Sequence, residues 1–153
     1  MTLDPQTVIS LGNMGSAAAL CFSAMGSAIG IGFAGMAAVG AWKRCFAQNK
    51  AAPFMLAVFV GAPITQTFYG MIVMMKLMDL AKAGGAFPAL LMWGLLGGLA
   101  IGASAVMQGR IAAGASDALA DTGQGFTNYL MALGIVESVA IFVMVFTLIA
   151  APK

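Results

Sequence analysis

Residues 129–150 read YLMALGIVESVAIFVMVFTLIA, and they indicate a membrane protein. The stretch is long and apolar enough to span a bilayer, which takes about 20 apolar residues. One carboxylate, Glu137, lies near its centre. A charge at that depth costs at least about 2.5 kcal/mol, so such a residue faces protein, pairs with a partner or binds an ion. Glu137 is therefore the candidate catalytic group, an ion-carrying carboxylate.

The composition of the chain leads to the same class. Of its 153 residues 61% are hydrophobic and 8% are charged, whereas about 25% of a soluble domain is charged. The chain has no His, and its two Cys residues lie outside any CxxC or Cys/His cluster, so zinc, haem and iron–sulfur sites are not expected. The net charge of +2 gives no indication of nucleic-acid binding.

Three further apolar segments predict, together with 129–150, four transmembrane helices: residues 8–42, 51–75 and 86–115. The joints between the four segments are short: residues 45–50, 76–85 and 116–125. Short joints connect neighbouring antiparallel helices. We therefore expect an all-α membrane protein made of two fused antiparallel hairpins, residues 1–80 and 81–153, with both ends on one side of the bilayer.

The two halves also resemble each other, which predicts a duplicated hairpin. The sequence SAI at 27–29 resembles SAV at 104–106. Small residues recur at every fourth position in the first and third segments, where they let helix backbones approach closely. This spacing fits packing inside one chain or an inner layer of a ring, and the residues alone leave both open. The small residues are Gly26, Gly30, Ala34 and Ala38, then Gly94, Gly98 and Gly102, then Ala105, Gly109 and Ala113.

Polar groups of two other segments are candidate partners of Glu137. Gln108 lies in the third segment, and Pro63 in the second has no amide hydrogen, so it can free a nearby carbonyl such as that of Phe59 or Ala62. Oxygen-only ligand sets suit hard cations, and one carboxylate matches a monovalent ion. The surplus of oxygens favours Na⁺ over H⁺. Steps of three and four place one group of the second segment on a single helix face: Ala62, Thr65, Gln66 and Tyr69.

Arg110 is a competing ion-pair partner of Glu137. It lies two residues after Gln108, about 200° around the helix, so if Gln108 faces Glu137 then Arg110 does not. We expect Arg110 to extend toward the nearer, cytoplasmic end. The first joint and its flank are the more basic, with Lys43, Arg44 and Lys50, which favours that joint as cytoplasmic.

The chain resembles the proteolipid rotor component (known as K or c) of prokaryotic V-type Na⁺-translocating ATPases. Three motifs carry the resemblance: APITQTFYG at 62–70, ASAVMQGRIAAG at 103–114 and GIVESVAI at 134–141. The resemblance implies that Tyr69 hydrogen-bonds the essential carboxylate. It also implies that Na⁺ is held by the backbone carbonyl of Ala62 and the side chains of Thr65, Gln66, Gln108 and Glu137.

The same resemblance implies partners and a mechanism. Identical subunits form a ring in the bilayer, a stator subunit with an essential arginine displaces the ion, and central-stalk subunits contact the joints at 46–50 and 117–125. The chain has no GxxxxGKS or GxxxxGKT phosphate loop. It is therefore expected to be a non-catalytic, ion-translocating subunit in the cell (inner) membrane of a bacterium or archaeon. Two alternatives stay open: the same rotor carrying H⁺, and a small proton-coupled multidrug exporter.

Overall fold

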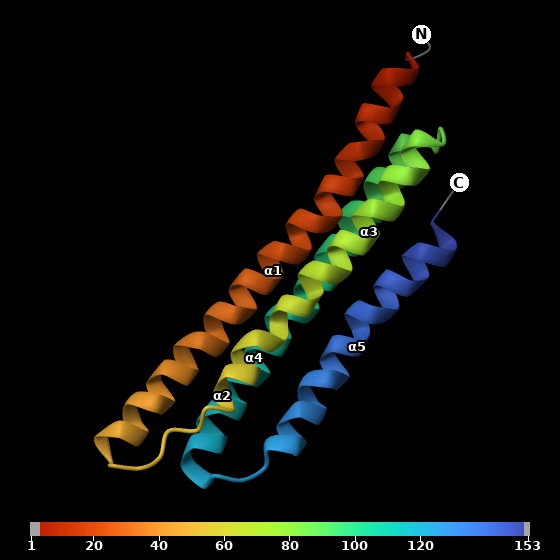
Figure 1. Cartoon of the computed structure of the whole chain (residues 1–153). Helices are drawn as coiled ribbons and strands as arrows, with labels where there is room; N and C mark the ends of the chain where they lie inside the picture. Colours follow the sequence, from red (N-terminus) through yellow and green to blue (C-terminus); the bar gives the residue numbers. More distant parts are fainter. Residues whose placement is uncertain (1–3, 152–153) are drawn as a thin grey trace.

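The structure is a computed structural model that describes residues 4–151. Its elements in chain order are α1 (Pro5–Ala47), α2 (Leu56–Gly61), the 3₁₀ turn η1 (Ala62–Ile64), α3 (Thr65–Lys82), α4 (Phe87–Thr122) and α5 (Phe126–Ala150). Within this part of the chain there is no strand. Because α2, η1 and α3 follow one another without a gap, the molecule has four long helical rods (Figure 1). All four are long and apolar enough to cross a membrane.

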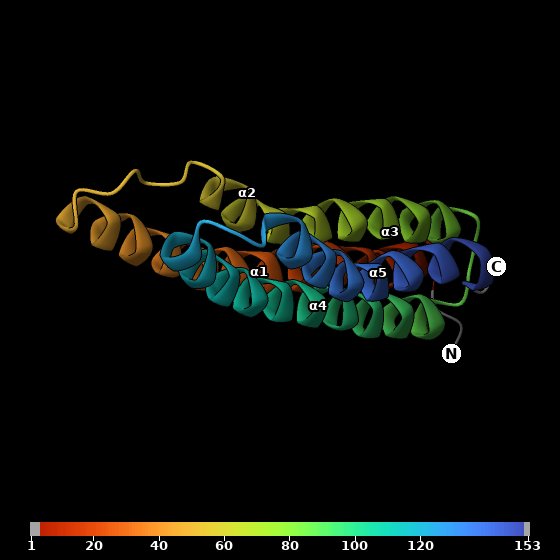
Figure 2. The same ribbon diagram turned by 90° about the horizontal axis from the view of Figure 1, so that it is seen from below.

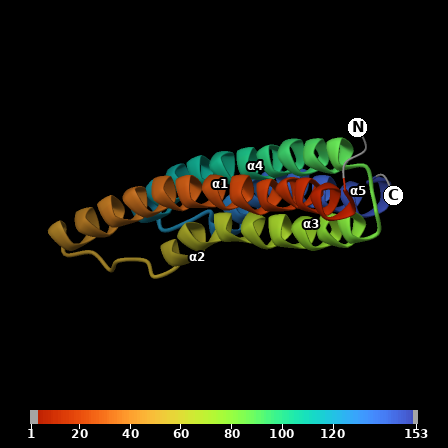
Figure 3. The same ribbon diagram turned by 90° about the horizontal axis from the view of Figure 1, so that it is seen from above.

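The rods form two antiparallel hairpins, as predicted. The start of α1, the α3–α4 connection and the end of α5 lie at the same end of the molecule (Figure 1). α1 and α5 lie on opposite sides of α3 and α4, as Figures 2 and 3 show from below and from above. We name the hairpin of α1, α2, η1 and α3 the first hairpin, and that of α4 and α5 the second hairpin. The predicted all-α fold class is confirmed.

The small residues of α1 and α4 form the closest helix contact in the molecule. A Cβ atom added to Gly26 would overlap the backbone of Gly102, and one added to Gly109 would overlap the backbone of Gly30. The fourfold spacing therefore describes packing inside one chain, where glycine lets two backbones touch. Toward the end of α4 the buried positions depart from this spacing, and Ala112 is fully buried in place of the predicted Ala113. The reason is that a helix has 3.6 residues per turn, so one face combines steps of three and four.

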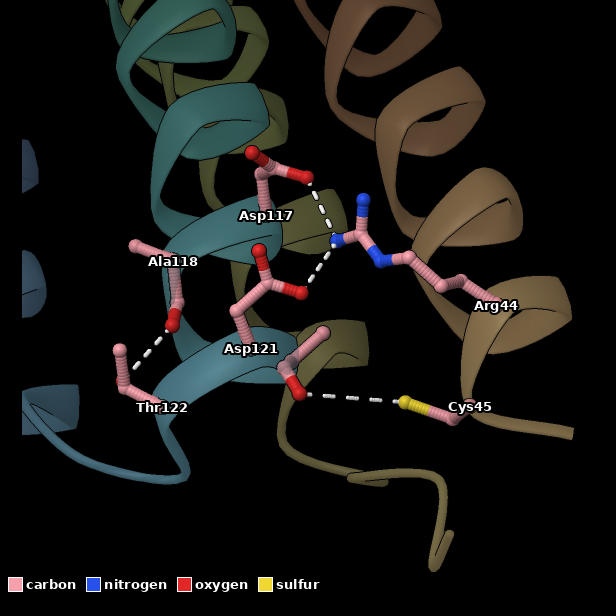
Figure 4. A network of polar contacts seen from close by, with 7 residues as sticks. Arg44, Cys45, Asp117, Ala118, Asp121 and Thr122 are labelled. Carbon is pink, nitrogen blue, oxygen red and sulfur yellow. Dashed lines mark hydrogen bonds and ion pairs between the residues drawn. The ribbon is translucent and has the colours of Figure 1, made fainter. Parts of the chain in front are cut away.

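Helix ends differ from the prediction, because the helices continue past the apolar runs into the expected joints. Asp117 and Asp121 lie on the last turns of α4 instead of in a loop. Both form an ion pair with the same nitrogen of Arg44 on α1, at 2.6 and 3.0 Å, as Figure 4 shows. α3 likewise continues to Lys82. Conversely, the second rod begins at Leu56 and not at residue 51, because Pro53 disfavours helix for the residue before it.

Candidate functional site

The first part of the site is the break in the second rod at Pro63. Pro63 lies in η1, where the Ala62 carbonyl accepts the backbone N–H of Thr65 in place of a regular α-helical bond. The Thr65 hydroxyl lies 3.1 Å from the same carbonyl oxygen. Of the two carbonyls named from sequence, the Ala62 oxygen is the one that meets a polar side chain, whereas Phe59 packs its ring on Phe126 with centroids 5.4 Å apart. A proline-induced 3₁₀ turn thus directs the Ala62 oxygen toward the polar face.

Both carboxylate oxygens of Glu137 have a hydrogen-bond donor. The Tyr69 hydroxyl donates to Oε1 at 2.7 Å, and Nε2 of Gln108 donates to Oε2 at 3.2 Å. The donors come from α3 and α4, so three rods converge on the one acid of α5. These two hydrogen bonds fix the position of the Glu137 side chain between the rods.

Two buried amides connect this acid to the break at Pro63. Gln66 and Gln108 are both fully buried, and Nε2 of Gln66 donates to Oε1 of Gln108 at 2.9 Å. Oε1 of Gln66 points the other way and lies 3.2 Å from the Thr65 hydroxyl. The structure therefore joins all six residues singled out from sequence in one continuous network: Ala62, Thr65, Gln66, Tyr69, Gln108 and Glu137.

Oxygen atoms outnumber protons at the Thr65 end of this network. Oγ1 of Thr65 lies within 3.2 Å of two acceptors, the Ala62 carbonyl and Oε1 of Gln66. A hydroxyl has a single hydrogen, so it can donate to only one of them. When it donates to Oε1 of Gln66, the Ala62 carbonyl accepts the Thr65 backbone N–H and keeps its second lone pair free. Oxygen atoms with free lone pairs are the ligands that a hard cation prefers.

Arg110 takes no part in the site. Its guanidinium lies over the ring of Phe33, 5.4 Å from the centroid. Within residues 4–151 the ion pairs join Arg44 to aspartates, and Glu137 is in none of them. The same residues contain no group of three His, Cys, Asp or Glu side chains that could hold a metal. The prediction that Arg110 and Gln108 face different ways is confirmed, because Gln108 contacts Gln66 and Glu137 instead.

Sequence reasoning missed the contacts that hold α5 in place. Ser104 Oγ donates to the carbonyl of Val136 at 2.8 Å, and Nε2 of Gln108 donates to the carbonyl of Leu133 at 3.1 Å. A backbone acceptor leaves no trace in a sequence. Ser104 could have been noticed, because it lies one turn before Gln108 on the same face of α4 and recurs as Ser27 in the repeat.

A known protein family matches part of the chain. Residues 91–150 match the family model of the ATP synthase C subunit. The matched region runs along α4 and α5 and includes Ser104, Gln108 and Glu137. No curated protein matches the chain at a significant level. Members of the matched family are ion-translocating rotor subunits of ATP synthases and form rings with their partner subunits. With four helices able to cross a membrane, the match indicates a multi-pass membrane protein.

Proposed function

We propose that the chain is a rotor subunit of a V-type ATPase that binds one Na⁺ at Glu137 and carries it across the membrane. The observation that carries the proposal is the excess of acceptor oxygens over protons at Thr65, two hydrogen-bonded residues away from an unpaired carboxylate. A site for a proton needs one acceptor, whereas a site for Na⁺ needs several oxygens. The family match of the second hairpin supports the rotor role.

In this proposal each residue has a distinct part. The Ala62 carbonyl, the Thr65 hydroxyl and Oε1 of Gln66 supply neutral oxygens, and Glu137 supplies the charge that balances the ion. Gln108 can turn its Oε1 toward the ion while its Nε2 still donates to α5. Tyr69 fixes the carboxylate through its hydroxyl. Displacement of the ion would be the task of a stator arginine in a partner subunit, since Arg110 is directed away.

The geometry supports the rotor over the multidrug exporter. A carrier of apolar drugs needs a cavity beside its carboxylate. Two grooves between α4 and α5 have volumes of about 550 and 530 Å³, and neither is lined by the Glu137 side chain. Instead, hydrogen bonds from Tyr69 and Gln108 enclose the acid.

The test is labelling of the purified protein with dicyclohexylcarbodiimide, which reacts with a protonated membrane carboxyl. We expect Na⁺ to slow the labelling of Glu137 at fixed pH, and K⁺ at equal ionic strength to leave the rate unchanged. Glu137→Gln should remove the labelled position. Gln108→Ala should weaken sodium protection by about tenfold or more, because a lost hydrogen bond to a charged group costs about 1.5–3 kcal/mol.

A labelling rate that does not change when Na⁺ is added would show that the ion carried is H⁺ or that the site binds no ion at all. A pH titration of the labelling rate separates these two cases, since a proton carrier would still show the titration of an accessible carboxyl. Sodium protection that survives Gln108→Ala unchanged would remove Gln108 from the ligand set while leaving Glu137 in place.

A further inference from the structure

The rod that carries Glu137 is the least anchored of the four. Of the residues of α5 only Leu133, Ala140 and Thr147 are buried, whereas α4 buries residues along its whole length. α5 packs on α4 and α3 and lies on the far side of both from α1 (Figure 2). Apolar packing thus leaves the rotation of α5 about its own axis weakly defined. The direction of the Glu137 side chain depends on that rotation.

Two hydrogen bonds from α4 define the rotation of α5 about its own axis. Ser104 binds the carbonyl of Val136 and Gln108 binds the carbonyl of Leu133. The donors are one turn apart on α4 and the acceptors about one turn apart on α5, so the bonds form two rungs between antiparallel helices. A helical carbonyl keeps a second lone pair for such a bond. Glu137 is the residue next to the acceptor Val136.

We propose that Ser104 is a positioning residue for the ion site: its hydroxyl holds α5 at the rotation that turns Glu137 toward Gln108 and Tyr69. Ser104 touches neither carboxylate oxygen and acts only through the backbone of Val136. Gln108 shares this task but also contacts the acid itself, so its effects on the two roles cannot be separated. The inference rests on the proposed function, because the effect of Ser104 is measured as a change in the affinity of the site for Na⁺.

The first hairpin provides an internal comparison. Ser27 is the counterpart of Ser104 in the repeat, and it is also buried, at 2% exposure against 6%. Its hydroxyl has no hydrogen-bond partner among residues 4–151. The first hairpin has no acid in its second rod at the position of Glu137, where Ile64 stands. The serine hydroxyl therefore bonds to the neighbouring rod only in the second hairpin, which is the hairpin that carries the acid.

The experiment compares three serine variants by sodium protection of Glu137 from dicyclohexylcarbodiimide. Ser104→Ala removes the hydroxyl. Ser104→Thr keeps it, and the added methyl has space because Ser104 lines the 530 Å³ groove between α4 and α5. Ser138→Ala is the matched control, since the Ser138 hydroxyl binds the carbonyl of Ile135 within α5 and holds no neighbouring helix.

We expect Ser104→Ala to raise the half-protecting Na⁺ concentration by about twofold to tenfold, as for loss of one hydrogen bond. Ser104→Thr and Ser138→Ala should stay within about twofold of the unmodified protein. The positioning role is wrong if Ser104→Ala has the same half-protecting Na⁺ concentration as the unmodified protein. It is also wrong if Ser104→Thr raises that concentration as much as Ser104→Ala does. A general loss of fold would lower the yield of labelled protein without moving the Na⁺ midpoint. Failure of the proposed function is distinct, because the unmodified protein itself would then show no sodium protection.

Discussion

The two hairpins have the same plan but contribute different chemistry to one site. The first hairpin supplies neutral oxygens around a proline break at Pro63, and the second supplies the acid, Glu137. At corresponding positions the first hairpin has Ile31 and Ile64 where the second has Gln108 and Glu137. Ile64 is about half exposed on the outside of the bundle. The two hairpins thus contribute to one shared site in place of two equal ones.

This division has an electrostatic consequence. A second acid close to Glu137 would raise the cost of charging either one, since like charges in a low-dielectric interior repel strongly. A proline in the first hairpin instead exposes a backbone oxygen, which in the proposed site ligates the cation without adding charge. One carboxylate with neutral oxygens matches one monovalent ion. Under the proposed function, two hairpins per carboxylate also means fewer ions moved for each helix pair.

The largest expected effect comes from moving the acid between the hairpins. Glu137→Gln should abolish ion transport, because an amide cannot balance the charge of a bound cation. Adding Ile64→Glu to that variant should not restore sodium protection or transport, since Ile31 cannot replace Gln108 and Ser27 makes no bond across to the second rod. Reconstituted transport and carbodiimide labelling would measure both. Recovery of sodium-sensitive labelling in the double variant would show that the two hairpins are interchangeable.

Sequence analysis could predict which residues share a face, and this was enough for most of the site. Steps of three and four place Thr65, Gln66 and Tyr69 together, and a buried acid demands partners. The four rods follow from apolar runs alone. The contacts in the structure agree with that set, while the role of each residue in ion binding stays a proposal. Periodicity succeeds here because a helix face and a membrane-spanning segment are both determined by residues that are near one another in sequence.

The sequence could not predict how the helices are aligned with one another along the axis of the bundle. The ion pair of Arg44 with Asp117 and Asp121 requires α1 and α4 to end at one level, which depends on how the glycine faces meet. Apolar runs alone therefore place the two aspartates in a loop. The acceptor role of the Val136 carbonyl was missed for a similar reason, since every residue has a carbonyl and only packing decides which one receives a second hydrogen bond.

A second difference between the hairpins lies in two corresponding glycines. A Cβ on Gly109 of α4 would overlap the backbone of Gly30, whereas a Cβ on its counterpart Gly32 of α1 meets nothing within 4 Å. We expect Gly109→Ala to destabilise the protein by about 1–3 kcal/mol or more, because backbones must separate. Gly32→Ala should be neutral or slightly stabilising, since alanine favours helix over glycine. Thermal unfolding in detergent measures both.

Equal loss of stability in the two glycine variants would contradict the asymmetric packing of α1 on α4. It would indicate that Gly32 is also in close contact with a neighbouring helix, as in a ring of identical subunits. Measurement on dissociated protomers and on assembled protein separates the two sources, because only the assembled form would be sensitive to Gly32→Ala.

The smallest expected effect concerns how the hairpins begin. The Asp4 carboxylate accepts from the Thr7 hydroxyl at 2.6 Å and from the Gln6 amide at 2.9 Å, which caps α1, whereas α4 starts after Ala86 without a side-chain cap. These bonds, that of Thr7 first, hold the pKa of Asp4 below its usual value. A lowered pKa in the folded state means that the cap stabilises α1 above the ordinary carboxyl pKa of about 3.9 and is lost as pH falls through the lower, folded value.

Amide hydrogen exchange at the first turn of α1 tests this, with the unmodified protein compared with Asp4→Ala at each pH. The protection lost in the variant should be modest at neutral pH, confined to the first turn, and should vanish as the carboxyl is protonated. The first turn of α4 serves as the control, because no titrating side chain caps it. A difference between the two proteins that persists unchanged in acid would mean that Asp4 acts through something other than its charge, and the contrast between the two helix starts would then lie in the backbone alone.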